Sequence, residues 1–77
     1  MRIYDPTTKR VLQTVTLFLT PGEAEELGQS ALDLARHPKN HHHHVSDAEC
    51  QREITVAVYT ADNVSEFDAE SRTVIDS

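Results

Sequence analysis

The clearest local signal in the chain is the stretch TPGEAEELGQSALDLAR, residues 20–36. Thr20, followed three residues later by Glu23, is a capping-box pattern, and Pro21 suits the first position of a helix. Apolar residues then recur three and four positions apart, which predicts one apolar helix face made of Ala24, Leu27, Ala31 and Leu34. A proline at position 38 restricts the residue before it, so we expect the helix to end near Arg36.

Two strands are predicted before this helix. Residues 2–4 suit a short strand, which the turn-forming run Asp5-Pro6-Thr7-Thr8 would end. The stretch from Val11 to Leu19 is rich in Val and Thr and alternates with period two, which predicts a longer strand. One face of that strand would bring Val15 and Leu17 to the core.

After the helix, the sequence predicts two more strands and a second helix. A turn at residues 38–40 leads to a short strand at residues 41–46. Residues 53–60 form another strand, in which Ile54, Val56 and Val58 alternate with Thr55, Ala57 and Tyr59. Asn63, with Glu66 three residues later, repeats the capping-box pattern and predicts a terminal helix. The apolar stripe of that helix would comprise Val64, Phe67, Ser71, Val74 and Ile75.

These elements follow the order β-β-α-β-β-α within one small domain of residues 1–77. The expected fold class is α+β, with a mostly antiparallel sheet and both helices on one of its faces. The other sheet face would be uncovered and would display Leu12, Phe18, Ala57 and Tyr59. We expect this open face, or an edge strand, to support a homodimer or to bind another protein. Scattered apolar residues of an ordinary surface are the alternative.

Four consecutive histidines, His41, His42, His43 and His44, are the only feature of the sequence that could carry chemistry. On a strand, each alternate pair of them projects to one face. Neutral imidazole suits Zn²⁺, Ni²⁺ or Cu²⁺, and a same-face pair could share one ion. Because a structural zinc site needs four ligands, Asp47 or another nearby donor would complete it, or a second subunit would contribute its own pair. The other nearby donors are His37, Glu49, Cys50 and Glu53.

The histidines also have a purely structural interpretation. Val45 is expected to point into the core, which would direct His41 and His43 to the margin of the core and His42 and His44 to the open face. One hairpin register pairs His44 with Glu53, a carboxylate that would favour the protonated imidazole.

The sequence argues against an enzyme. Cys50 is the only cysteine, and it follows Asp47 and Glu49, whose charges disfavour a thiolate. Gly22 and Gly28 are the only glycines and both belong to the first predicted helix, so a phosphate-binding glycine loop is not predicted.

Charge limits the classes of partner. The net charge is −6, and residues 41–77 carry two arginines against eight carboxylates. Nucleic acid and anionic membrane are poor partners for such a surface, because both are bound largely through Lys and Arg. The beginning of the chain does not read as a signal peptide, which predicts a cytoplasmic protein.

Together these features predict a non-enzymatic binding or interaction protein that acts through the open sheet face or the histidine strand. A transition-metal-binding protein that uses the histidine cluster is one alternative. An immunity or antitoxin-like protein is the other, with the acidic C-terminal half occluding a basic toxin.

Overall fold

The structure is a computed structural model that describes residues 1–77. The chain divides into two compact units. The helix–hairpin unit comprises residues 19–63, and the terminal unit comprises residues 1–18 together with 64–77. Each unit holds one α-helix and one two-stranded antiparallel sheet, which confirms the α+β class and the order β-β-α-β-β-α. The single domain over residues 1–77 stays a prediction.

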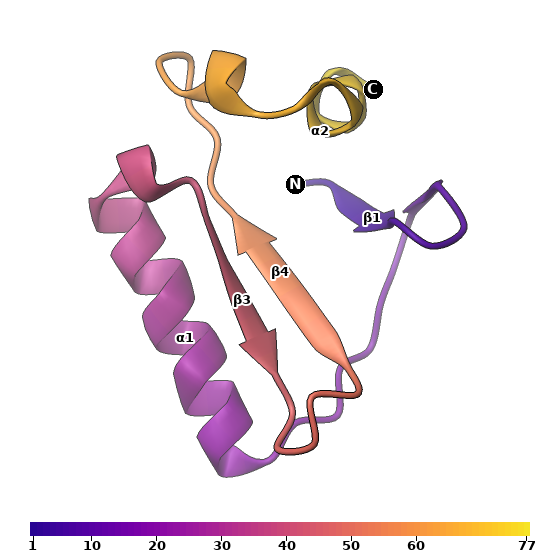
Figure 1. Cartoon of the computed structure of the whole chain (residues 1–77), viewed down its shortest axis with the longest axis vertical. Coiled ribbons are helices and arrows are strands. Elements are labelled where there is room, and N and C mark those ends of the chain that lie inside the picture. The colour runs from indigo at the N-terminus through magenta and orange to yellow at the C-terminus, as the bar shows by residue number, and fades with distance from the viewer. The chain divides into compact units, whose positions relative to one another are not determined.

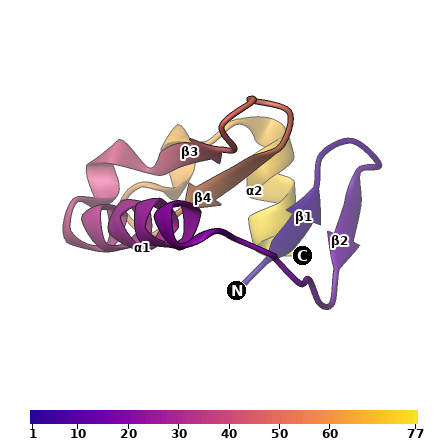
Figure 2. The same cartoon turned by 90° about the horizontal axis from the view of Figure 1, so that it is seen from below.

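In the helix–hairpin unit, an amphipathic helix packs on a two-stranded hairpin and thereby buries its apolar face. It contains α1 (Pro21–Arg36), a short 3-10 helix η1 (Pro38–Asn40), β3 (His42–Ser46) and β4 (Glu53–Ala57). Helix α1 runs alongside the hairpin in Figure 1 and covers one of its faces in Figure 2. The two strands pair antiparallel, from His42 opposite Ala57 to Ser46 opposite Glu53.

The start of α1 follows the sequence prediction. The Thr20 hydroxyl accepts a hydrogen bond from the Glu23 backbone N–H at 3.2 Å, and the Glu23 carboxylate accepts one from the Thr20 backbone N–H at 2.9 Å. Two backbone donors that lack helical partners are thereby satisfied, and the predicted capping box is confirmed. The helix ends at Arg36, also as predicted.

The core of this unit lies between α1 and the inner face of the hairpin. Leu34 is 0% exposed and Val45 is 3% exposed, and they are the only buried apolar side chains in the structure. Ile54 and Val56 on β4 are half-buried, while Thr55 between them is exposed. The alternation predicted for residues 53–60 is therefore confirmed, although the strand ends at Ala57.

A buried asparagine connects η1 to the segment that follows β4. Asn63 is 5% exposed, and its side-chain amide donates hydrogen bonds to the carbonyls of Pro38 at 2.8 Å and Val58 at 2.9 Å. Its side-chain oxygen accepts a hydrogen bond from the Thr60 backbone N–H at 2.7 Å. Asn63 thus ties η1 to the segment after β4, and it does not cap the terminal helix as its sequence context predicted.

The terminal unit contains a short hairpin and a short helix. Strands β1 (Ile3–Asp5) and β2 (Arg10–Leu12) pair antiparallel, with Ile3 opposite Leu12. A 3-10 helix η2 (Val64–Glu66) precedes α2 (Ala69–Asp76), whose N-cap is Asp68. The Asp68 carboxylate accepts a hydrogen bond from the Ser71 backbone N–H at 2.7 Å, which lowers the pKa of that carboxyl. The residues of the predicted apolar stripe, Val64, Phe67, Ser71, Val74 and Ile75, are all half-buried. The continuous helix predicted from Asn63 does not form, because α2 begins only at Ala69 and Val64 belongs to η2.

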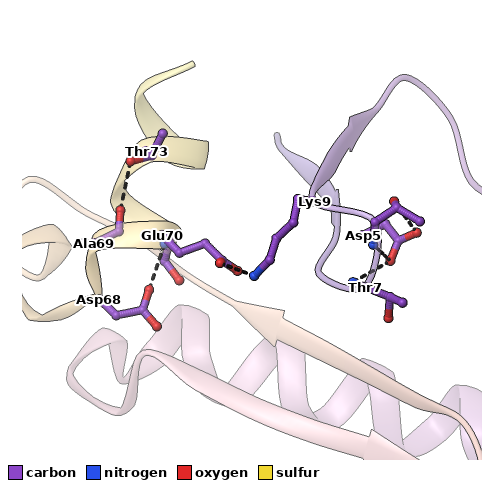
Figure 3. A network of polar contacts seen from close by, with 9 residues as sticks. Asp5, Thr7, Lys9, Asp68, Ala69, Glu70 and Thr73 are labelled. Carbon is purple, nitrogen blue, oxygen red and sulfur yellow. Dashed lines mark hydrogen bonds and ion pairs between the residues drawn. The ribbon is translucent and has the colours of Figure 1, made fainter.

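Polar contacts at the surface connect the parts of the terminal unit. Lys9, in the turn between β1 and β2, forms an ion pair with Glu70 of α2 at 2.5 Å (Figure 3). The hydrogen bond and the negative charge of Glu70 raise the pKa of Lys9. Asp5 accepts hydrogen bonds from the Thr8 hydroxyl at 2.8 Å and from the Thr7 backbone N–H at 2.9 Å, which lower the pKa of its carboxyl.

The strand predicted from Val11 to Leu19 does not form beyond Leu12. Only its beginning belongs to β2, which ends at Leu12, and residues 13–19 have no strand structure. Strand β1 is three residues long and therefore supplies only three pairing partners. Without a neighbouring strand, the backbone groups of residues 13–19 have no ladder to join, whatever their side-chain pattern.

Because this long strand does not form, the single predicted sheet does not form either. The sequence predicted one sheet with both helices on one face, whereas the strands form two separate pairs, β1 with β2 and β3 with β4. The open sheet face predicted from Leu12, Phe18, Ala57 and Tyr59 does not form, because Leu12 and Ala57 lie in different sheets and the other two residues lie in none. Phe18 lies outside both sheets and is 93% exposed.

Candidate functional site

Three of the four histidines, His42 to His44, lie on β3, where the alternation of side chains decides which rings point outward. His42 and His44 are exposed, whereas His43 is half-buried on the same side of the strand as the buried Val45. The predicted directions of these three histidines are therefore confirmed. The outward face of the β3–β4 hairpin carries His42 and His44 beside the exposed side chains of Glu53, Thr55 and Ala57.

His41 departs from the predicted alternation. It precedes β3 and has a φ of 41°, a left-handed conformation that non-glycine residues adopt rarely. Its N–H donates to the Pro38 carbonyl at 3.0 Å, which closes the turn between α1 and β3. This turn brings the His41 ring against that of His42, with ring centroids 4.6 Å apart and planes 25° apart. The expectation that His41 shares a face with His43 is wrong for this reason.

Three imidazoles thus gather at the outward face, and His41, His42 and His44 are called the imidazole cluster below. The Nδ1 atoms of His41 and His42 are 2.6 Å apart, a distance at which one of them donates a hydrogen bond to the other. The rings of His42 and His44 meet edge to face, with centroids 5.1 Å apart. The sequence indicated the number of histidines here but not which three would meet.

Glu53 orients the ring of His44. The predicted register placed these residues directly opposite each other, but His44 pairs with Thr55, and Glu53 lies two residues away on the same face. From this diagonal position the Glu53 carboxylate still reaches His44 Nδ1 at 2.8 Å, and the Thr55 hydroxyl lies 2.9 Å from the same nitrogen. An ionised carboxylate only accepts hydrogen bonds, so Nδ1 of His44 carries the hydrogen. In neutral His44 the lone pair is then on Nε2.

The environment of His42 favours its neutral form. Desolvation lowers the pKa of His42, and the neighbouring imidazoles of His41, His44 and His43 lower it further. A neutral imidazole keeps one nitrogen with a lone pair, which is the form that accepts hydrogen bonds and binds metal ions.

The other residues suggested as metal ligands do not join the cluster. Asp47 accepts a hydrogen bond from the Gln51 backbone N–H at 2.8 Å and thereby shapes the β3–β4 loop. Cys50 is exposed in that loop, at a φ of 55°. No group of three or more His, Cys, Asp or Glu side chains is arranged to hold a metal ion. A centre built from His41, His42, His43, His44 and Asp47 together therefore stays a prediction, and the imidazole cluster with Glu53 is what the structure brings together.

Comparisons with known proteins do not assign the chain to a family. No protein-family model matches it, and neither a curated protein nor a solved structure is significantly similar to it. Neither helix of the structure has the length and apolar composition needed to cross a membrane.

Proposed function

We propose that this chain is a small, non-enzymatic, cytoplasmic interaction protein whose binding surface is the outward face of the β3–β4 hairpin. The observation that carries the proposal is that α1 packs on the inner face alone, so His42, His44, Thr55 and Ala57 are exposed. A two-stranded sheet also leaves one edge of each strand unpaired, and such edges are templates for pairing with another chain.

The partner that this surface fits best is a second copy of the chain. A face related to itself by a two-fold axis is the commonest arrangement in soluble oligomers. This face carries imidazole, hydroxyl and methyl groups and the Glu53 carboxylate, which contacts His44, but no lysine or arginine, so two copies can meet without repulsion between permanent positive charges. The same lack of basic residues disfavours nucleic acid and anionic membrane as partners.

The antitoxin-like alternative has no specific observation in its favour. Four of the eight carboxylates in residues 41–77 already have partners within the chain, and these are Asp47, Glu53, Asp68 and Glu70. Half of the carboxylates in this region therefore form hydrogen bonds or ion pairs within the chain, at a turn, a helix cap and two basic side chains.

Sedimentation equilibrium of the untagged chain, in buffer with EDTA, tests the proposal. We expect a monomer–dimer equilibrium that Ala57→Glu weakens at least tenfold, because the substitution places a carboxylate on the outward face of each copy. Ala48→Glu, in the exposed loop between the strands, is the matched control and should leave the equilibrium unchanged. A monomer at all concentrations in EDTA, or equal effects of the two variants, would reject the outward face as a surface for self-association without metal.

A further inference from the structure

We propose that His42 and His44 form a two-histidine chelate for a borderline divalent ion such as Zn²⁺ or Ni²⁺, and that two copies of the chain share the ion. This inference rests on the proposed function, since it names what would join the two outward faces. It differs from a site within one chain, because each copy supplies only two ligands.

The polar contacts leave Nε2 of His44 as its metal-binding atom, and leave Nε2 of His42 as well in the tautomer that donates to His41. Glu53 and Thr55 flank Nδ1 of His44, and Nδ1 of His41 lies 2.6 Å from Nδ1 of His42. When His42 donates that hydrogen bond, Nε2 of His42 has the lone pair, as Nε2 of His44 does. A hydrogen bond from the second ring nitrogen is the usual way in which metal-binding histidines are oriented and made more basic.

The spacing of the rings suits a shared ion. His42 and His44 are two residues apart on one strand face, with ring centroids 5.1 Å apart. Zn–N bonds of about 2.0–2.1 Å in a tetrahedral site place two ligand nitrogens roughly 3.3 Å apart. Both rings are exposed, so rotation about their side-chain torsions is the movement required to bring the two Nε2 atoms to this spacing, without a shift of the β3 backbone.

A tetrahedral ion bound by His42 and His44 would have two further coordination positions, which a second copy of the chain can fill. No third His, Cys, Asp or Glu side chain is arranged to complete the site within one chain. His43 is on the opposite side of β3, and Glu53 is engaged with His44. A two-fold axis through the ion would add the same pair from the second copy, which gives the four nitrogen ligands of a closed tetrahedral site.

Calorimetric titration of the untagged, metal-stripped chain with ZnCl₂ and NiCl₂ tests this inference. We expect saturation at about one ion per two chains, together with a shift to dimer in sedimentation experiments. His42→Ala and His44→Ala should each abolish this binding. His43→Ala, which removes a histidine from the same run but from the other strand face, is the matched control and should retain it.

Glu53→Gln tests the orientation of His44 without removing a ligand. The amide can still accept the hydrogen bond from Nδ1 but lacks the charge, so we expect affinity to fall about tenfold, at the lower end of the range for such supporting residues. Circular dichroism of each variant shows whether the fold is retained, as expected at the exposed positions 42, 44 and 53, and is required of the half-buried control His43→Ala.

Several results would overturn the inference. Equal losses in His43→Ala and His44→Ala, or equal binding by the urea-unfolded chain, would show chelation by an unstructured histidine run. One ion per chain without dimerisation would reject the shared site. A dimer that forms in EDTA and ignores metal would reject this inference while leaving the proposed function intact.

Discussion

The helix–hairpin unit and the terminal unit each combine a helix with a two-stranded sheet, but they bury different amounts of their side chains. Leu34, Val45 and Asn63, the only buried residues of the structure, all belong to the helix–hairpin unit. The terminal unit has none, and Glu70 of its helix contacts the hairpin through an exposed ion pair with Lys9 and through Tyr4. Burial stabilises far more than an exposed ion pair does, so the same secondary structure elements are expected to differ widely in stability.

The largest expected effect is that of Leu34→Ala in the helix–hairpin unit. Removing a fully buried leucine side chain costs about 2–5 kcal/mol, which is a large part of the stability of so small a chain. Urea denaturation followed by circular dichroism measures the loss. Leu32→Ala, two residues away and 42% exposed, is the matched control and should cost less than about 1 kcal/mol. Similar losses at both positions would contradict the assigned core.

Asn63→Asp should have the next largest effect. It replaces the amide that donates to the Pro38 and Val58 carbonyls with a carboxylate that donates to neither. Two lost hydrogen bonds at buried groups cost roughly 2–4 kcal/mol. The matched control is Asn40→Asp, an exposed asparagine of η1, and thermal unfolding of both variants makes the comparison. If Asn63 acted as a helix cap, Asp would replace it well and little stability would be lost.

A smaller effect is expected from Thr20→Ala, which removes the N-cap of α1. Loss of such a cap costs about 1 kcal/mol. Thr20→Ser keeps the hydroxyl that accepts from the Glu23 N–H and should restore most of the stability. Denaturation midpoints of the three proteins test the capping box, and a Ser variant as unstable as the Ala variant would argue against it.

The smallest effect is expected from Lys9→Met in the terminal unit. The lost ion pair is exposed, so global stability should change little, and amide hydrogen exchange is the more sensitive measurement. We expect faster exchange in α2 and unchanged exchange in α1, and a high salt concentration should produce the same pattern in the unmodified chain. Lys39→Met is the control, and faster exchange in α1 of the Lys9 variant would contradict the division into two units.

Sequence reasoning succeeded where structure depends on near neighbours along the chain. The capping box at Thr20 and Glu23 and the alternation within residues 53–57 were predicted correctly, because the groups involved lie a few residues apart. It failed for residues 13–19, where alternation predicted a strand and the fold provides no neighbouring strand to pair with. Alternation favours an extended backbone, but a β-strand forms hydrogen bonds only where a second segment of the chain lies beside it.

The same distinction between local and tertiary features applies to the candidate site. The sequence by itself determined that four imidazoles occupy consecutive positions and that His42 and His44 share a strand face, because side-chain alternation is a local property of an extended backbone. Only the tertiary structure decided that the left-handed turn at His41 adds a third ring, that Glu53 reaches His44 diagonally, and that Asn63 ties η1 to the segment after β4. The left-handed conformation at His41 goes against the usual preference of a non-glycine residue, the Glu53 contact depends on strand register, and the Asn63 contact joins positions 25 residues apart.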